Sequence, residues 1–314
     1  MNLQEIIDRI LAHDRNAIAR AITMIENDRV ESTSLLKILY RHTGRAYRIG
    51  ITGPPGAGKS TIANKLAKLY RRDNKRVGII AVDPTSPFTG GALLGDRVRM
   101  TDVELDDGVF IRSMASRGSM GGLSKKAVEA ADILDASGCD IIFFETVGVG
   151  QSELDVARAA DTTVVVLVPE SGDSIQAMKA GLMEIADFFV LNKSDRAGAE
   201  QAALSIKMVL NFKHSVDGWF PDVIQCIAND GKGIERIEEM VTRHKEFLTD
   251  KNILMGKRKN RTIERIKSLI GEQLNIHFWN EEREQLLESQ VQNVITFQTT
   301  PYDIVDRLLS DVQR

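Results

Sequence analysis

The chain has 314 residues, of which 27% are charged and 43% hydrophobic, and its formal net charge at pH 7 is −3. This balance is typical of a globular protein with a large core, and it gives no general preference for nucleic acid or for a membrane surface. The two cysteines, Cys139 and Cys226, match no metal-binding or redox spacing, so we expect buried reduced thiols and a cytoplasmic location. We expect no membrane contact, because the N-terminus has no signal-peptide pattern and the longest apolar run, residues 164–168, is too short to cross a bilayer.

Residues 1–45 are predicted to form an N-terminal helical segment. Apolar side chains recur at the spacing of one helix face over residues 3–11, again over residues 17–25 and again over residues 35–39. Ser32 to Ser34 are candidates to cap the third helix. The pattern leaves two roles open, a cap on the following domain or a surface that binds a partner.

Residues 46–250 alternate short apolar runs with helical stretches, which predicts an α/β domain with a mostly parallel sheet. Several runs consist of Val, Ile and Phe throughout, as expected for strands that helices cover on both faces. The expected strands are residues 48–52, 77–82, 109–112, 141–145, 163–168, 188–192 and 223–227. Ligands of such sheets bind at the carboxyl ends of the strands, and most of the polar motifs occur there.

The segment Gly53 to Ser60 reads G-P-P-G-A-G-K-S and fits the phosphate-binding pattern G-x-x-x-x-G-K-[ST], a P-loop. It lies between an expected strand and an expected helix over residues 61–70, which is the context that this motif requires. Glycines let the loop turn so that backbone N–H groups face phosphate oxygens, and the helix N-terminus adds positive potential. We expect Lys59 to contact the β- and γ-phosphates and the Ser60 hydroxyl to ligate Mg²⁺. The nucleotide-binding residues expected here are Gly53, Pro55, Gly56, Ala57, Gly58, Lys59, Ser60 and Thr61.

Three carboxylates are candidate ligands of Mg²⁺ or of its bound water. Asp83 ends an expected strand, and Asp96 follows a glycine-rich segment, where a helix N-cap is the alternative. Glu145 begins E-T-V-G, which resembles the D-x-x-G motif of GTPases with Glu in place of Asp. In that motif the Gly148 N–H would contact the γ-phosphate, whereas nothing in the sequence fixes the direction of Gln151. The predicted metal ligands are Ser60, Asp83, Asp96 and Glu145, and the predicted catalytic residues are Lys59, Asp83, Asp96 and Glu145.

The segment 192–195 reads N-K-S-D and fits N-K-x-D directly after an expected strand. The Asp195 carboxylate can accept hydrogen bonds from N1–H and the exocyclic amino group of guanine. Adenine lacks this donor pair and would leave the carboxylate unpaired, so we expect GTP or GDP rather than an adenine nucleotide. The predicted base-binding residues are Asn192, Lys193, Asp195, Ala228 and Asn229. The last two lie where GTPases carry a Ser-Ala loop; Ile227 replaces the Ser, and the Ala228 N–H can still reach guanine O6.

Residues 251–314 are predicted to form helices of a different character. An apolar stripe runs over residues 263–278 on one long helix, and Pro301 is expected at the first position of the final helix. We interpret the basic cluster at residues 257–261 as a solvated helix start rather than a nucleic-acid patch, given the net charge. From the pattern alone, packing on the core and homodimerisation are both open.

Together, these motifs resemble one family, the methylmalonyl-CoA mutase-associated GTPase chaperones, which are also labelled arginine/ornithine transport ATPases. The resemblance is weaker before residue 45 and after residue 250. It implies a P-loop GTPase fold similar to that of the urease and hydrogenase nickel-insertion GTPases. The matching stretches are residues 53–61, 82–91, 94–100, 114–118, 145–153, 172–173 with 176 and 179, and 192–195.

The resemblance implies a GTP-hydrolysing chaperone that gates the loading of adenosylcobalamin into an acyl-CoA mutase and the removal of inactivated cofactor. It further implies a nucleotide-sensing switch at residues 169–179 and a dimerisation arm at residues 251–314, which favours a homodimer. We expect the partner mutase to hold the cobalamin, because no histidine here has the Asp of D-x-H-x-x-G two residues before it. Pro54 replaces the extra lysine of two-lysine P-loops, which argues against catalysis by a lysine donated across a dimer. The alternative function is a P-loop ATPase or kinase that energises amino-acid transport, against which N-K-x-D argues.

Overall fold

The computed structural model describes residues 2–83, 103, 105–115, 125–146, 152–171, 180–211 and 218–310. Contacts divide the chain into two compact units, Met1–Lys257 and Arg258–Arg314. The first unit contains the sheet and the motifs of interest. None of the helices in the described ranges is long and apolar enough to cross a bilayer.

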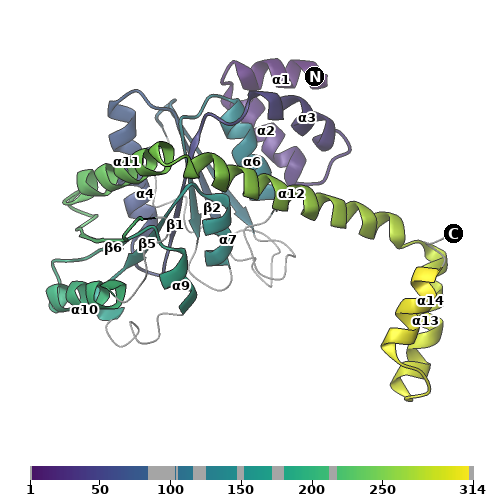
Figure 1. Cartoon of the computed structure of the whole chain (residues 1–314). Helices are drawn as coiled ribbons and strands as arrows, with labels where there is room; N and C mark the ends of the chain where they lie inside the picture. The colour runs from purple at the N-terminus through teal and green to yellow at the C-terminus, as the bar shows by residue number, and fades with distance from the viewer. Residues whose placement is uncertain are drawn as a thin grey trace. The chain divides into compact units, whose positions relative to one another are not determined.

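A sheet forms the centre of the first unit (Figure 1). In the described part of the chain it has seven strands in the order β3-β2-β4-β1-β5-β6-β7. Every neighbouring pair is parallel, which confirms the predicted α/β class. The strands are β1 (Tyr47–Thr52), β2 (Val77–Asp83), β3 (Val109–Ala115), β4 (Ile141–Thr146), β5 (Thr162–Leu167), β6 (Phe188–Leu191) and β7 (Val223–Gln225). All seven expected strands are therefore present, with ends shifted by at most three residues.

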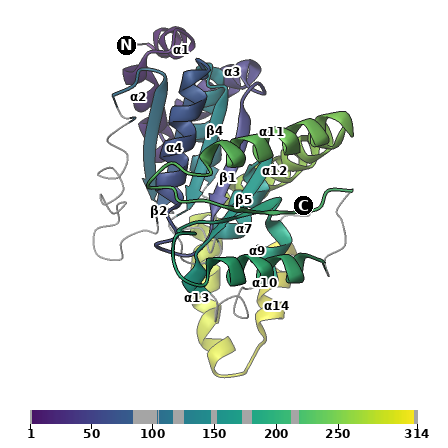
Figure 2. The ribbon, with the colours of Figure 1, turned by 90° about the vertical axis from the view of Figure 1, so that its left-hand side faces the viewer.

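Helices cover both faces of the sheet because side chains of a strand point alternately to opposite sides (Figure 2). On β4, Phe143 packs into the cluster formed with α4 (Lys59–Arg72) and α11 (Ile234–Asp250). Its neighbours Ile142 and Phe144 pack into the opposite cluster, with α6 (Lys125–Ala136) and α7 (Ser152–Ala159). Next to β5 and β6 that side is covered by α9 (Ala180–Ile185) and α10 (Ala199–Asn211). Burial on both faces explains the uninterrupted apolar strands.

The N-terminal helices α1 (Leu3–Leu11), α2 (Arg15–Glu26) and α3 (Ser32–Leu39) share an apolar core with α6. A short 3-10 turn, η1 (Tyr40–His42), leads from them toward β1. The following chain is held by Asp135, whose carboxylate accepts the backbone N–H groups of residues 44, 45 and 46. Asp135 is 1% exposed, so these hydrogen bonds satisfy a buried carboxylate.

The predicted cap of α3 is wrong. The helix begins at Ser32, its N-cap is Glu31, and no side chain caps it. Ser32 is buried and its hydroxyl donates a 2.9 Å hydrogen bond to the Met24 carbonyl oxygen. The hydroxyl therefore connects α3 to the end of α2 instead of receiving an N–H group of its own helix.

The helix α12 (Ile253–Phe278) begins in the first unit and continues in the second, which also contains α13 (Glu281–Ile295) and α14 (Pro301–Ser310). Pro301 is the first residue of α14, as predicted, and the Asn280 side chain caps α13 through the Arg283 N–H. Ile304 and Leu308 on α14 are buried. On α12, the side chains of the expected stripe are exposed in the single chain at Ile263, Ile266, Ile270 and Leu274, whereas Phe278 is partly buried.

Candidate nucleotide site

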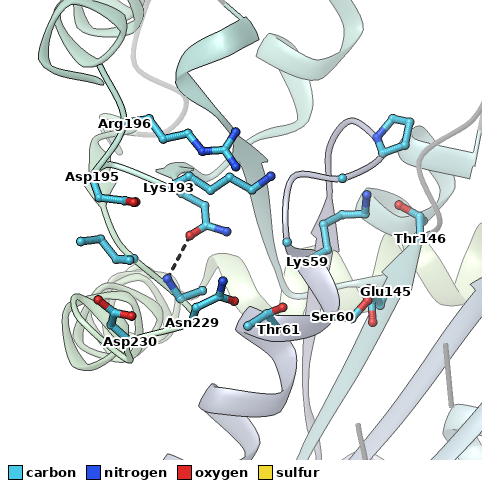
Figure 3. Close-up of a pocket in the computed structure, with 16 residues that line it drawn as sticks. Lys59, Ser60, Thr61, Glu145, Thr146, Lys193, Asp195, Arg196, Asn229 and Asp230 are labelled. Atoms are coloured by element: carbon cyan, nitrogen blue, oxygen red, sulfur yellow. Dashed lines mark hydrogen bonds between the residues drawn. The ribbon is translucent and has the colours of Figure 1, made fainter. Parts of the chain in front are cut away.

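A cavity of about 580 Å³ lies at the carboxyl ends of β1, β4, β6 and β7 (Figure 3). These strand ends meet at one edge because the strands are parallel, which is where ligands of open α/β sheets bind. Loops that are far apart in the sequence thus share one cavity. It is lined by Pro55, Gly56, Gly58, Lys59, Ser60, Thr61, Glu145, Thr146, Asn192, Lys193, Asp195, Arg196, Ile227, Ala228, Asn229 and Asp230.

The P-loop joins the end of β1 to the start of α4 and requires glycine at two positions. Gly53 has a φ of +134°, and a Cβ there would lie 2.1 Å from the Val166 carbonyl oxygen. Gly58 has a φ of +91°, and a Cβ there would lie 2.3 Å from Nδ2 of Asn192. Both the backbone conformation and the close approach exclude other residues.

Lys59 is the first residue of α4 and is 6% exposed. Its Nζ donates hydrogen bonds to the carbonyl oxygens of Gly53 at 2.8 Å and Pro54 at 2.9 Å. The ammonium group therefore lies over the loop whose backbone would surround a phosphate. Gly53, which we expected to bind nucleotide, is not among the residues that line the cavity.

Ser60 and Glu145 meet at the boundary between α4 and β4. The Ser60 hydroxyl donates a hydrogen bond to Oε1 of Glu145, whose side chain is 1% exposed. One residue further, the Thr146 hydroxyl donates to the Thr52 hydroxyl at 3.1 Å and connects the ends of β4 and β1. A hydroxyl and a carboxylate are the hard oxygen ligands that Mg²⁺ prefers.

The side chains of the other two predicted metal ligands, Asp83 and Asp96, lie outside what the structure describes. Asp83 is the last residue of β2, and its backbone lies at the same sheet edge, since its neighbour Val82 pairs with Thr146. Asp96, Gly148 and Gln151 lie outside the described residues. Within the residues that are described, no group of three or more His, Cys, Asp or Glu side chains is arranged to hold a metal.

Asn192 connects three segments at the floor of the cavity. Its Nδ2 donates to the Ala57 carbonyl oxygen at 2.8 Å, and its Oδ1 accepts the Ala228 N–H at 3.0 Å and the Cys226 thiol at 3.4 Å. With 3% exposure, the side chain holds the P-loop and the loop after β7 in register. The N–H of Ala228, which we expected to meet guanine O6, donates here to Asn192.

The turn at Lys193 to Asp195 is fixed against β7. Lys193 has a φ of +57°, and the N–H and hydroxyl of Ser194 both donate to the Cys226 carbonyl oxygen, at 3.1 and 2.9 Å. Burial raises the pKa of the Cys226 thiol to about 12, so this cysteine is a neutral hydrogen-bond donor. Both cysteines are buried and free, as predicted.

Several lining residues were absent from our prediction, namely Thr146, Arg196, Ile227 and Asp230. Arg196 directly follows N-K-x-D, so its position next to the motif was the available signal. It forms an ion pair with Glu170, in the short 3-10 turn η3 (Pro169–Ser171) after β5. The N-K-x-D motif ends at Asp195, so it predicts no role for Arg196.

The comparisons agree with these motifs. A family model described as the methylmalonyl-CoA mutase-associated GTPase MeaB matches residues 18–283. A protein of Pyrococcus horikoshii is 51% identical over 272 residues, which are 86% of each chain. The GTPase ArgK of Escherichia coli is 37% identical over 289 residues, covering 89% of this chain and 87% of ArgK.

Two further similarities extend over most of the chain. The mouse protein named methylmalonic aciduria type A homolog, mitochondrial, is 33% identical over 301 residues, covering 88% of this chain and 72% of the mouse protein. Among solved structures, one named LAO/AO transport system kinase aligns with a TM-score of 0.76 and 29% identity, covering 100% of this chain and 99% of its own.

Proposed function

Because the chain belongs to the methylmalonyl-CoA mutase-associated GTPase family, we propose that it gates adenosylcobalamin loading into an acyl-CoA mutase and protects or reactivates that mutase. The chain is a GTPase, as are its named relatives. The observation that carries the proposal is the single cavity formed by the P-loop, Glu145 and the segment 192–195. This cavity is lined both by the phosphate-binding loop and by Asp195, whose carboxylate is suited to bind guanine.

In this proposal each loop handles one part of GTP. The N–H groups around Gly56 and Gly58 and the ammonium of Lys59 bind the β- and γ-phosphates. The Asp195 carboxylate accepts the two N–H groups on the guanine edge, at the opposite side of the cavity from Lys59 (Figure 3). Asn192 contributes by holding these two ends at a fixed separation.

We further propose that Ser60 and Glu145 hold Mg²⁺ together with Asp83 and Asp96. Support comes from the hydroxyl–carboxylate pair that borders the cavity beside Lys59. The bound ion would neutralise charge that develops on the phosphate oxygens during hydrolysis. Glu145 would orient that ion from the end of a rigid buried strand, where its side chain has little freedom.

In this proposal the nucleotide state of the chain acts on a partner mutase, and the mutase itself holds the adenosylcobalamin. A switch of this kind hydrolyses GTP slowly alone and faster when the partner completes the water-positioning group. The test is GTP turnover by the full chain with and without a purified adenosylcobalamin-dependent acyl-CoA mutase, with Lys59→Ala as the inactive control. We expect stimulation by the mutase, and GTP-dependent transfer of adenosylcobalamin to it. A mutase that neither accelerates turnover nor changes its cofactor loading would contradict the proposal.

We also propose that residues 251–314 are the dimerisation arm of a homodimer, with the support lying mainly in the compact unit 258–314. On α12, Ile263, Ile266, Ile270 and Leu274 recur on one face and are 39–65% exposed. In the same unit, an apolar cavity of about 500 Å³ lies between α13 and α14. Exposed apolar side chains that gather on one face are typical of protein interfaces, and a second copy offers a matching face.

The oligomeric state is tested by measuring the mass of the protein with light scattering as it elutes from a size-exclusion column. We expect the mass of two chains, and the mass of one chain for the double variant Ile266→Glu, Ile270→Glu. Ser268→Glu, at an exposed position on the opposite side of the same helix, is the matched control. A wild-type protein with the mass of one chain would contradict the dimer.

The competing function is an ATPase or kinase in amino-acid transport, and the similar solved structure bears the name of such a transport-system kinase. This function requires the cavity to accept adenine, which offers no donor pair to Asp195. A turnover rate with ATP that equals or exceeds the rate with GTP would favour this function over the chaperone.

A further inference from the structure

Arg196 lies in the wall of the nucleotide cavity although no motif includes it. Figure 3 shows its side chain beside that of Lys193, running from the side of Asp195 into the space between this turn and the P-loop. Lys59 lies over the P-loop carbonyl groups, where phosphates are expected. The Arg196 side chain therefore enters the cavity from the turn that carries Asp195, at the end where the base is expected.

The backbone of Arg196 is held by the same turn that positions Asp195. The Arg196 N–H donates to the Lys193 carbonyl oxygen at 3.0 Å, and the Arg196 carbonyl oxygen accepts the Ala199 N–H at 3.3 Å. Ser194, within this turn, is bonded twice to the Cys226 carbonyl oxygen. The Cα atoms of Asp195 and Arg196 are thus fixed relative to each other and to the cavity wall.

The guanidinium of Arg196 is paired with the carboxylate of Glu170 in η3. Both side chains are about half exposed, at 48% and 51%, and such surface ion pairs add little to stability. The ion pair can instead orient the guanidinium. This group is planar, and a carboxylate that bonds one edge leaves both faces available. The ion pair with Glu170 thus restrains a guanidinium that lines the cavity and is half exposed.

We propose that Arg196 is a further nucleotide-contacting residue, whose guanidinium packs on a face of the guanine ring while Glu170 positions it. The proposal rests on the guanine-reading role of Asp195 proposed above, since that role places the ring beside Arg196. A guanidinium stacks on an aromatic face and is attracted by its π electrons. One turn of the chain thus recognises the base twice, with Asp195 at its edge and Arg196 at its face.

The experiment separates base binding from phosphate binding in the full chain. GDP affinity is measured by titration, and inorganic tripolyphosphate, which has no base, is measured as a competitor. A stacking cation at a partly exposed site predicts that Arg196→Ala weakens GDP binding about three- to tenfold and leaves tripolyphosphate unchanged. Arg196→Lys keeps the charge without the plane and should stay weakened, and Glu170→Gln should weaken GDP about twofold. The control is Arg158→Ala, an exposed arginine paired with Asp155 away from this cavity.

Each other result has a distinct meaning. Wild-type GDP affinity in Arg196→Ala would overturn the proposal, and so would an equal loss for GDP and tripolyphosphate, which indicates a phosphate contact. An unchanged Glu170→Gln would overturn the positioning role of Glu170. Lys59→Ala must weaken both ligands; if it weakens neither, the nucleotide site itself is misassigned, which is a different failure from that of Arg196.

Discussion

The Asn192 side-chain amide donates a 2.8 Å hydrogen bond to the carbonyl oxygen of Ala57, 135 residues earlier in the chain. Through its Oδ1 the same amide accepts the N–H of Ala228. The phosphate-binding loop and the two loops expected around the base are therefore one connected unit. The Asn192 side chain leaves no room for a Cβ at position 58, so its placement also explains why the P-loop has a glycine there.

Asn192→Ala should weaken both folding and binding, because it leaves a buried carbonyl and a buried N–H without their partner. We expect a loss of about 1–3 kcal/mol in the free energy of unfolding, measured by urea denaturation. GDP affinity should fall as well, since the two ends of the site are no longer held together. Asn260→Ala, at an exposed position on α12, is the control and should change neither quantity.

Glu145→Gln should impair Mg²⁺-dependent turnover more than nucleotide binding. Glutamine retains an oxygen that accepts the Ser60 hydroxyl but has no charge for a divalent cation. We expect GTP turnover at fixed Mg²⁺ to fall at least about tenfold, with GDP affinity in EDTA unchanged. The exposed Glu239→Gln on α11 serves as control. Full turnover by Glu145→Gln would argue against a metal-binding role for Glu145.

Asp195→Asn should reduce the preference for GTP over ATP. Hydrogen bonds to a charged group are worth about 1.5–3 kcal/mol, so the ratio of the two affinities should fall about 10- to 100-fold. The matched control is Asp230→Asn, a second carboxylate in the cavity wall that no base-reading motif includes. If the variant keeps the full GTP-over-ATP ratio, Asp195 does not read the base.

Because His244 is buried, we expect the folded chain to lose stability as the pH falls. The histidine is 1% exposed, and its Nδ1 is 2.8 Å from the Thr162 hydroxyl. Its pKa is lowered from 6.5 to about 4, mainly by burial and also by Lys257, while Asp187 and Asp161 oppose the shift. The unfolded chain therefore binds a proton at higher pH than the folded chain does, and folding loses stability as the pH falls from 6.5 toward 4.

The loss from this one group should be on the order of 3 kcal/mol over that pH range. It is measured by urea denaturation at successive pH values for the wild type and for His244→Gln. The variant should be less stable at neutral pH, yet its stability should fall less steeply between pH 6.5 and 4. Equal slopes would contradict a neutral buried histidine. His277→Gln, at an exposed position, should keep the wild-type slope.

The order and type of elements in the central domain could be predicted from the sequence because local patterns determine them. Continuous Val, Ile and Phe runs indicate strands buried on both faces, and all seven appear in the described part of the chain. The P-loop and N-K-x-D are also local, since each needs particular residues at neighbouring positions. The cap of α3 was mispredicted because the choice between Ser32 and Glu31 depends on a tertiary contact, the hydrogen bond from Ser32 to Met24.

What this sequence determined by itself was the chemistry of each loop: a phosphate-binding loop, a strand ending in Glu145, and a carboxylate suited to guanine. Only the tertiary structure decided which of these groups touch, because contacts across the sheet depend on strand order and register. It bonded Ser60 to Glu145, connected Ala57 to Ala228 through Asn192, and turned Arg196 toward Glu170. Each of these pairs is far apart in the sequence, and parallel strands bring their ends to one edge, where no local pattern can specify the partner.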